Sequence, residues 1–198
     1  MWKSYLFEHP ENITPQQLEQ ELLPALPAWR REQTLAFKHL DAQVLSASAF
    51  LLLQNGLRND FGVKEPLHFD YLEHGKPLLR EHPELHFSLS HCSKGALCVI
   101  DDSGPVGCDI EALDRKISDA LMERCCSEEE LSAIRGAAVP THAFIRLWTM
   151  KEAALKLTGE GLTPHLATLL TAERQATLVF YTRIFEEKGY AFSIVHHH

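Results

Sequence analysis

The sequence has no apolar run long enough to cross a membrane. A spanning helix needs ~20 apolar residues, whereas the run from Ala49 to Leu53 is far shorter and lies inside a helical pattern. The first segment, MWKSYLFEHPEN, also lacks the basic start and the long apolar stretch of a secretory signal. These absences exclude a membrane-spanning protein at the level of the sequence and lead us to expect a cytoplasmic one.

Cysteine is scarce, and its spacing indicates neither a disulfide framework nor a metal site. The five cysteines include no C-x-x-C pair, and the adjacent Cys125 and Cys126 cannot easily bridge each other. We therefore expect free thiols in a reducing compartment. A catalytic cysteine is the alternative, but no neighbouring residues support it.

Positive charge is also in short supply, since the net charge is −8. Neutralising nucleic-acid phosphates needs a basic surface, so non-specific nucleic-acid binding is not expected. Histidine is frequent, but His196–His198 resemble the stub of an expression tag, and the other histidines show no zinc-ligand spacing. The sequence also lacks G-x-G-x-x-G and G-x-x-x-x-G-K-[ST], the phosphate loops of common nucleotide-binding folds.

Apolar periodicity predicts helices in the N-terminal third. Residues 28–55 show helical spacing, a break near Leu40-Asp41 can divide this stretch into two helices, and Asn55-Gly56 is the expected stop. After a polar stretch, Gly75-Lys76-Pro77 predicts a turn.

The middle of the chain alternates as strands do. Residues 85–111 predict a three-stranded antiparallel meander, with the short turn Asp102–Pro105 between its last two strands. Near the C-terminus, the segments ATLVFYTRIF and YAFSIV predict two or three more strands.

Further helices are expected between these groups of strands, where the chain becomes helical again from Ser118 onward. Ser127 and Glu130 have the spacing of a capping box. Thr141 is the expected cap of a long helix that runs to Thr158 and ends at Gly159. The order helix, strands, helix, strands then predicts an α+β fold in two similar halves. We assign the halves to residues 1–103 and 104–195, joined near Ser103–Pro105, and set residues 196–198 apart as a tag remnant.

Two carboxylates stand out on the predicted strand VGCDIE. Strand alternation puts Asp109 and Glu111 on one face, about 6.5–7 Å apart along the strand. Two such groups repel each other unless they are protonated or bridged by a cation. Magnesium is the natural bridge because it prefers oxygen ligands and keeps room for water and phosphate. The alternative interpretation is a solvated strand edge with two charges.

The long predicted helix, FIRLWTMKEAALKLTGEG, carries a second group. Trp148, Glu152 and Lys156 lie on one helical stripe. The alternative is an ordinary surface ion pair between Glu152 and Lys156, worth a few tenths of a kcal/mol. Ser90 and His91, in the loop that leaves a predicted strand, and Lys76 in its turn are unremarkable by themselves.

In combination, these segments resemble a known family. In order, G-K-P, F-x-x-S-H, V-G-x-D-I-E and F-x-x-x-W-x-x-K-E-A-x-x-K are similar to the motifs of the 4′-phosphopantetheinyl transferases, specifically the surfactin-synthetase-activating type. The matched segments run from Tyr71 to about Leu162. The resemblance implies a pseudo-twofold monomer whose halves each pack a small antiparallel sheet on helices, with coenzyme A between them. Residues 1–103 would form the side that binds coenzyme A, and residues 104–195 the side that holds the metal and the carrier protein.

The same resemblance implies roles for individual residues. Asp109, Glu111 and Glu152 match the acidic residues that hold Mg²⁺, or Mn²⁺, in the family. His91, with Ser90 beside it, matches the histidine that contacts a phosphate.

Three lysines also match. Lys76 corresponds to the lysine near the adenosine part of coenzyme A, and Lys156 to the helix lysine at the pyrophosphate. Lys151 corresponds to the lysine before the metal-binding glutamate.

One family feature is missing. Members commonly carry an arginine three residues after an aspartate, where it meets the 3′-phosphate of coenzyme A, but Asp41 is followed three residues later by Val44. Arg30, Arg31 and Lys38 are candidates to take over part of this contact.

The expected reaction is attack of a carrier-protein serine hydroxyl on the β-phosphate of coenzyme A, with 3′,5′-ADP as the leaving group. Asp109, Glu152 and Lys156 would be catalytic, and Glu152 would take the serine proton directly or through water. Lys156 and His91 would add positive charge at the phosphates.

The partner would be an apo acyl or peptidyl carrier protein, docked near Lys151, Lys156 and the region Met122–Ser127. Two alternatives remain at this point: a magnesium-dependent phosphohydrolase and an inactive module that binds carrier proteins.

Overall fold

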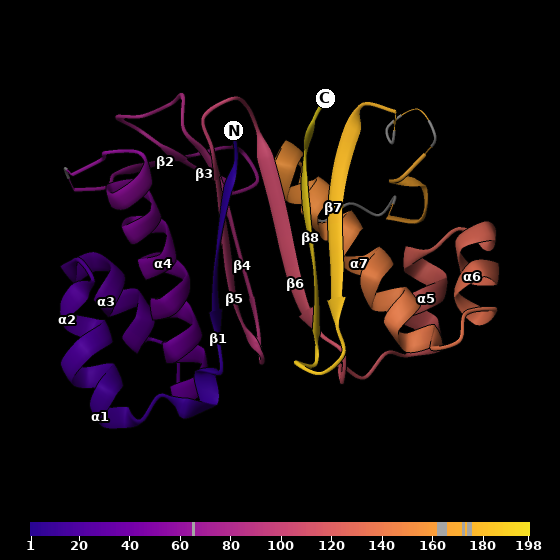
Figure 1. Cartoon of the computed structure of the whole chain (residues 1–198), viewed down its shortest axis with the longest axis horizontal. Coiled ribbons are helices and arrows are strands. Elements are labelled where there is room, and N and C mark those ends of the chain that lie inside the picture. The colour runs from indigo at the N-terminus through magenta and orange to yellow at the C-terminus, as the bar shows by residue number, and fades with distance from the viewer. Residues whose placement is uncertain (65, 162–165, 172, 174–175) are drawn as a thin grey trace.

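The described residues form two three-stranded antiparallel sheets that lie between helices, and a separate two-stranded sheet. The computed structural model describes residues 1–198 except 65, 162–165, 172 and 174–175. Figure 1 shows α4 (Leu40–Asp60) outside one sheet and α7 (Pro140–Thr158) outside the other, with the two sheets between them. The predicted α+β class, with a small antiparallel sheet packed on helices in each half, is confirmed.

The elements follow the chain in two runs. The first run comprises β1 (Lys3–Glu8), η1 (Pro10–Asn12), α1 (Pro15–Gln17), η2 (Leu18–Leu22), α2 (Leu23–Ala25), α3 (Ala28–Leu35), α4, β2 (Phe69–Tyr71), β3 (Pro77–Leu79), β4 (His86–Cys92) and β5 (Gly95–Asp101). The second comprises β6 (Val106–Ala112), α5 (Asp119–Cys125), α6 (Glu128–Arg135), α7, η3 (Leu166–Thr168), β7 (Leu178–Phe185) and β8 (Tyr190–His197). The strand orders are β1-β5-β4, β2-β3 and β6-β8-β7. Leu162, where the stretch of family resemblance ends, lies outside the described residues.

The predicted meander over residues 85–111 is only partly correct. Strands β4 and β5 form the expected antiparallel hairpin. The third strand, β6, pairs with β8 near the C-terminus and belongs to the other sheet. The short turn after Asp101 has the composition of a hairpin turn, but it connects a strand of one sheet to a strand of the next. The strand that pairs with β6 is β8, in which Ser193 lies opposite Asp109.

The predicted helices of the first half are confirmed except for one end. A break at residues 36–39 separates α3 from α4, as expected. The expected stop at Asn55-Gly56 is wrong, because α4 continues to Asp60. A Cβ added to Gly56 would lie 2.7 Å from the Tyr5 ring and 2.9 Å from Ile100. This glycine therefore permits close packing of α4 on the sheet and does not end the helix.

The capping signals of the second half are confirmed in two of three positions. Ser127 and Glu130 form the capping box that begins α6, and Gly159 ends α7 with a left-handed φ of 76°. Thr141 is not the cap of α7, since the helix begins at Pro140 after Val139. Proline is favoured in the first turn because its missing N–H has no intrahelical partner there.

The C-terminal segments form β7 and β8. The expectation of two or three strands is met by these two within the described residues. His196 pairs with Val106, and His197 pairs with Leu178. These two histidines therefore extend the sheet, although the sequence set them apart from the fold.

A hydrophobic core lies between the two three-stranded sheets. Strands β6 and β8 contribute Val106, Cys108, Ile110, Tyr190, Phe192 and Ile194. These residues pack against Cys92, Leu97 and Val99 of β4 and β5. Burial of this area from water stabilises the contact between the halves. Helix α7 closes the opposite face of its sheet with Ala153 and Leu157 against Val195.

All five cysteines are free and buried, as the sequence predicted for free thiols. Burial raises the pKa of Cys92, Cys108 and Cys126 to about 11. Because the thiolate is the reactive form, these groups are poor nucleophiles at neutral pH. In the described part of the chain, no helix combines the length and the apolar character that a membrane crossing needs.

Candidate active site between the two sheets

The two sheets meet along β4 and β6, where serine hydroxyls replace the backbone ladder. Ser88 Oγ accepts a hydrogen bond from the backbone N–H of Cys108 at 3.0 Å. Ser90 Oγ accepts one from the N–H of Ile110 at 3.3 Å. Cys108 and Ile110 point into the core between the sheets, so strand alternation turns the Asp109 side chain to the opposite face of β6, where Ser90 Oγ donates to it.

A cavity of about 550 Å³ opens at this joint. It brings together seven residues that the sequence singled out: Ser90, His91, Asp109, Glu111, Trp148, Glu152 and Lys156. Other residues of its wall are Leu89, Ile110, Arg115, Leu121, Arg124 and Leu166. The cavity therefore draws on β4, on β6 and on α7, and we call it the acidic cavity after its three carboxylates.

A second cavity, of about 340 Å³, adjoins the acidic cavity. The two share Leu89, Glu152 and Lys156 as wall residues. The second cavity also contains Lys76 in the Gly75-Lys76-Pro77 turn, together with His74, Phe87, Ser88, Leu155, Gly159 and Gly161. Lys76 thus lies in a space that is continuous with the acidic residues, although it belongs to the other half of the chain.

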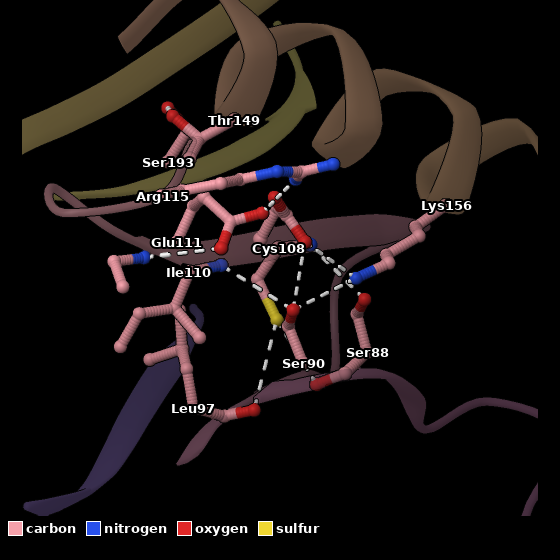
Figure 2. A network of polar contacts seen from close by, with 12 residues as sticks. Ser88, Ser90, Leu97, Cys108, Ile110, Glu111, Arg115, Thr149, Lys156 and Ser193 are labelled. Carbon is pink, nitrogen blue, oxygen red and sulfur yellow. Dashed lines mark hydrogen bonds and ion pairs between the residues drawn. The ribbon is translucent and has the colours of Figure 1, made fainter. Parts of the chain in front are cut away.

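Asp109 is held by two donors. Ser90 Oγ donates to Asp109 Oδ1 at 2.7 Å, and Lys156 Nζ donates to the same oxygen at 2.7 Å and to Ser90 Oγ at 2.9 Å. Figure 2 shows Lys156 reaching from its helix toward Ser90 across the joint. Burial opposes the charge of Lys156, but the attraction of Asp109, Cys108 and Glu152 and the hydrogen bond to Asp109 together outweigh it and raise the pKa of Lys156.

Glu111 has a different partner. Arg115 donates to Glu111 Oε2, and the N–H of Ala112 donates to Glu111 Oε1 at 3.1 Å. The guanidinium carbon of Arg115 also lies 4.9 Å from the centre of the Trp148 ring. The sequence motifs did not point to Arg115, although its spacing of four residues from Glu111 is a signal that could have found it.

Glu152 has a buried carboxylate oxygen, Oε1, that makes no hydrogen bond. Burial and the negative charge of Asp109 raise the pKa of Glu152, while Lys156 and Arg115 partly offset this effect. A carboxylate that is poorly solvated and surrounded by like charge attracts either a proton or a cation.

His91 is neutral in the ligand-free protein at neutral pH. Removal of water by its surroundings lowers the pKa of His91, and repulsion from Lys156 and Arg30 lowers it further. The expectation that His91 supplies positive charge therefore does not hold for the ligand-free site. A bound phosphate would favour the protonated ring, because an opposite charge nearby stabilises the charged form.

The close approach of α7 to β6 depends on Gly107. A Cβ added to Gly107 would lie 2.0 Å from the Ala153 carbonyl oxygen and 2.6 Å from the Leu157 nitrogen. Only glycine fits such a contact. It sets the distance between the helix that carries Glu152 and the strand that carries Asp109.

Lys76 ties the turn of the first half to the end of α7. Its Nζ donates to the Leu157 carbonyl oxygen at 2.6 Å. Burial lowers the pKa of Lys76 from its ordinary value of 10.5 to about 8. The ammonium group therefore already has one strong acceptor at the edge of the second cavity.

Lys151 does not join the site. Its ammonium group is buried among the helices and donates to the Cys125 carbonyl at 2.7 Å, the Leu166 carbonyl at 2.8 Å and Glu130 Oε2 at 2.6 Å. All three N–H donors of the group are used in this way. Lys151 therefore fastens α7 to α5, α6 and η3, and its assignment as a ligand for coenzyme A has no geometric support.

The two arginines proposed for phosphate binding point in different directions. Arg30 donates to the carbonyl and hydroxyl oxygens of Ser46 and lines a small cavity of about 180 Å³ next to Gly75 and Leu89. Arg31 donates to the Leu23 carbonyl at 2.9 Å and is not a wall residue of any of these cavities. Of the two, only Arg30 lies near the candidate site.

The described residues contain no preformed metal site. No group of three or more His, Cys, Asp or Glu side chains among them is arranged to hold an ion. Lys156 and Arg115 instead occupy oxygens of Asp109 and Glu111. The chemistry of the cavity nevertheless fits a hard divalent cation, because it contains three carboxylates and the unpartnered Glu152 Oε1.

Comparison with known proteins points to one kind of transferase. A sequence model of the 4′-phosphopantetheinyl transferase superfamily matches residues 105–197. The 4′-phosphopantetheinyl transferase psf-1 of Bacillus pumilus is 37% identical over 119 residues, which cover 58% of this chain and 50% of the relative. The 4′-phosphopantetheinyl transferase Sfp of Bacillus subtilis (strain 168) is 30% identical over 137 residues, which cover 68% of this chain and 60% of the relative. The chain thus spans between half and two thirds of the length of these curated relatives.

With the fold and the acidic cavity, these matches make the chain similar to the 4′-phosphopantetheinyl transferase superfamily, most directly over residues 105–197. Within the superfamily, the Bacillus relatives support the surfactin-activating type, as the motifs predicted.

Proposed function

We propose that the protein transfers the 4′-phosphopantetheine arm of coenzyme A to a serine of an apo carrier protein and releases 3′,5′-ADP. The observation that carries this proposal is the acidic cavity, where Asp109, Glu111 and Glu152 lie with Ser90 and His91. Coenzyme A would occupy this cavity and the adjoining one. We further propose that the protein acts as a cytoplasmic monomer.

The reaction asks the protein chiefly to position groups and to stabilise charge. The carrier serine oxygen forms a bond to the β-phosphorus, the bond from that phosphorus to the bridging oxygen breaks, and 3′,5′-ADP leaves. A divalent cation, Mg²⁺ or Mn²⁺, held by Asp109, Glu111 and Glu152 would neutralise the pyrophosphate and the departing oxygen.

Glu152 is the proposed acceptor of the serine proton. Its raised pKa brings it closer to neutral, and a stronger base accepts a proton more readily. Its Oε1 has no hydrogen bond that would have to break first. Glu152 would take the proton directly or through a water molecule.

Positive charge for the phosphates would come from residues on both sides of the joint. Lys156, whose pKa is raised, stays charged and can share its N–H donors between Asp109 and a phosphate oxygen. His91 would become a cationic donor as the phosphate binds. Lys76 and Arg30 are proposed contacts of the adenosine and phosphate end, next to the second cavity.

The carrier protein would dock beside the acidic cavity, over α5 and the segment Met122–Ser127. Leu121 and Arg124 of α5 already form part of the cavity wall. Lys151 is removed from the expected docking surface, because its side chain is only 2% exposed. Docking would therefore depend on α5 and on an apolar contact, in keeping with the net charge of −8.

The decisive experiment is mass spectrometry of an apo carrier protein incubated with coenzyme A, Mg²⁺ and the enzyme. The proposal expects the carrier mass to increase by about 340 Da, since transfer adds the phosphopantetheine arm covalently. EDTA should abolish the increase, and Asp109→Asn should reduce the rate at least ~10²-fold while the protein stays folded. A near-normal rate for this variant would refute the assignment of the site.

The same experiment separates the alternatives. A phosphohydrolase would release phosphopantetheine and leave the carrier unmodified. A module that only binds carriers would do neither. The similarity of the chain to 4′-phosphopantetheinyl transferases and the three intact carboxylates favour transfer.

A further inference from the structure

We propose that Arg115 is the built-in counter-ion of the acidic cavity: it holds Glu111 in the metal-free protein and must leave that carboxylate when a divalent cation binds. This inference rests on the metal dependence proposed above. It assigns Arg115 the role of a positioning residue that competes with the cation and does not touch the reacting atoms.

The first argument is the occupation of Glu111. Arg115 takes its Oε2, the Ala112 N–H takes its Oε1, and the Glu111 side chain is only 17% exposed. A cation that approaches Glu111 therefore meets a carboxylate whose oxygens are both engaged. Figure 2 shows the Arg115 side chain stretched alongside Glu111, within the polar network of the joint.

The second argument is the charge of the cavity. Its three carboxylates are matched by three cationic side chains, Lys156, Arg115 and Arg124. These six groups sum to a charge of about zero, and a divalent cation added to all of them would leave a net positive site. Electrostatics therefore favours the departure of one cation when the metal enters.

The third argument is that Arg115 can leave more easily than Lys156. Lys156 has two acceptors on the joint, Asp109 and Ser90. Arg115 follows β6 in a turn, and the described acceptor of its guanidinium is Glu111 alone. The face of Trp148, 4.9 Å from the guanidinium carbon, offers a place where the displaced group can stay.

Direct binding of Mn²⁺ to the metal-free protein tests this inference without any turnover. Free Mn²⁺ is followed by electron paramagnetic resonance, with the protein first stripped by EDTA and exchanged into clean buffer. We expect Arg115→Met to bind Mn²⁺ about threefold to tenfold more tightly than wild type, as suits the loss of a competing ion pair of modest strength. Arg115→Gln should agree, and Arg115→Lys, which keeps the charge, should stay near wild type.

Arg124→Met is the matched control. Arg124 lines the same cavity, is exposed, and is removed with the same loss of charge. Among the described contacts it makes no ion pair with Glu111, so this variant should change Mn²⁺ affinity by less than Arg115→Met does. An equal gain in Mn²⁺ affinity in both variants would mean that any loss of positive charge from the cavity has this effect, and it would overturn the inference.

The sign of the effect distinguishes competition from a structural role. If Arg115 merely shaped the site, folded Arg115→Met and Arg115→Gln, checked by circular dichroism, would bind Mn²⁺ no better than wild type or more weakly, and the inference would fail. If neither wild type nor the variants bind Mn²⁺, the proposed metal dependence fails with it. If wild type binds and the variants do not gain, only the role of Arg115 is lost.

Discussion

At the scale of single residues, Glu152 combines a proposed catalytic role with an environment that disfavours its charged form. Its Oε1 is buried without a hydrogen-bond partner, and burial together with Asp109 raises its pKa. The charged form is therefore less favourable in the folded protein than in the unfolded chain. Strain of this kind is common where a group is held ready for a cation or a proton.

This environment predicts opposite effects of Glu152→Gln on stability and on activity. Between the ordinary pKa of 4.5 and the raised pKa the folded state binds more protons than the unfolded chain, so stability falls as the pH rises through this window. At pH 7 without metal, the variant should melt at the same temperature as wild type or a few degrees higher. Transfer to the carrier should fall at least ~10²-fold.

Thermal melts in EDTA and the carrier mass assay measure the two effects separately. Glu187→Gln is a suitable control, since Glu187 is exposed in the turn between β7 and β8. A clear loss of melting temperature in Glu152→Gln would contradict this view of the site.

The sequence predicted which side chains share the cavity better than it predicted their partners. Strand alternation placed Asp109 and Glu111 on one face, and helical spacing placed Glu152 with Lys156, because both patterns follow from local geometry. The direction of Lys151 could not be predicted, since its acceptors on α5, α6 and η3 are brought together only by the tertiary fold.

At the scale of elements, the contact between α7 and β6 positions the site. Gly107 lets the helix backbone approach the strand where an added Cβ would overlap the Ala153 carbonyl oxygen at 2.0 Å. The order of strands in the sheets could not be predicted from local sequence patterns. Strand β6 pairs with β8, which lies far along the chain, and a turn signal indicates only pairing between neighbouring strands.

Gly107→Ala should push α7 away from β6. We expect a loss of about 1–3 kcal/mol in the free energy of unfolding, the usual range for overpacking, and a reduced transfer rate because Glu152 and Lys156 move relative to Asp109. Urea titration and the carrier assay provide the measurements. Gly104→Ala is the matched control, because nothing lies within 4 Å of the position of its added Cβ. Equal free energies of unfolding for the two variants would show that α7 can move away from β6 without destabilising the protein.

At the scale of the whole molecule, side chains connect the halves at several points besides the serines of the joint. Lys76 reaches the carbonyl end of α7, and Tyr190 Oη donates to Glu8 Oε1 at 2.7 Å, with Lys188 beside it. Such long-range contacts hold together the two groups of residues that line the cavities. They lay beyond sequence patterns, which reach only from one turn or strand to the next.

The Lys76 contact predicts a pH-dependent stability. The pKa of Lys76 is about 8 in the folded protein and ordinarily 10.5. Between these values the unfolded chain binds more protons, so this group makes the folded state more stable as the pH rises from 8 to 10.5.

Lys76→Met should remove that rise. The difference in unfolding free energy between wild type and variant, from urea titrations at several pH values, should therefore change across this interval and stay constant below it. Lys116→Met, at an exposed position, should show no such change. A pH-independent difference for Lys76→Met would mean that the ammonium group is better solvated than its position at Leu157 indicates.

The burial of every native thiol has a practical consequence for studying the carrier complex. Because all five cysteines are enclosed and those in the core resist ionisation, a maleimide dye should react far faster with a cysteine introduced on the surface. A fluorophore could thus be attached beside α5 without replacing any native cysteine, and its distance to a labelled carrier could be followed in solution.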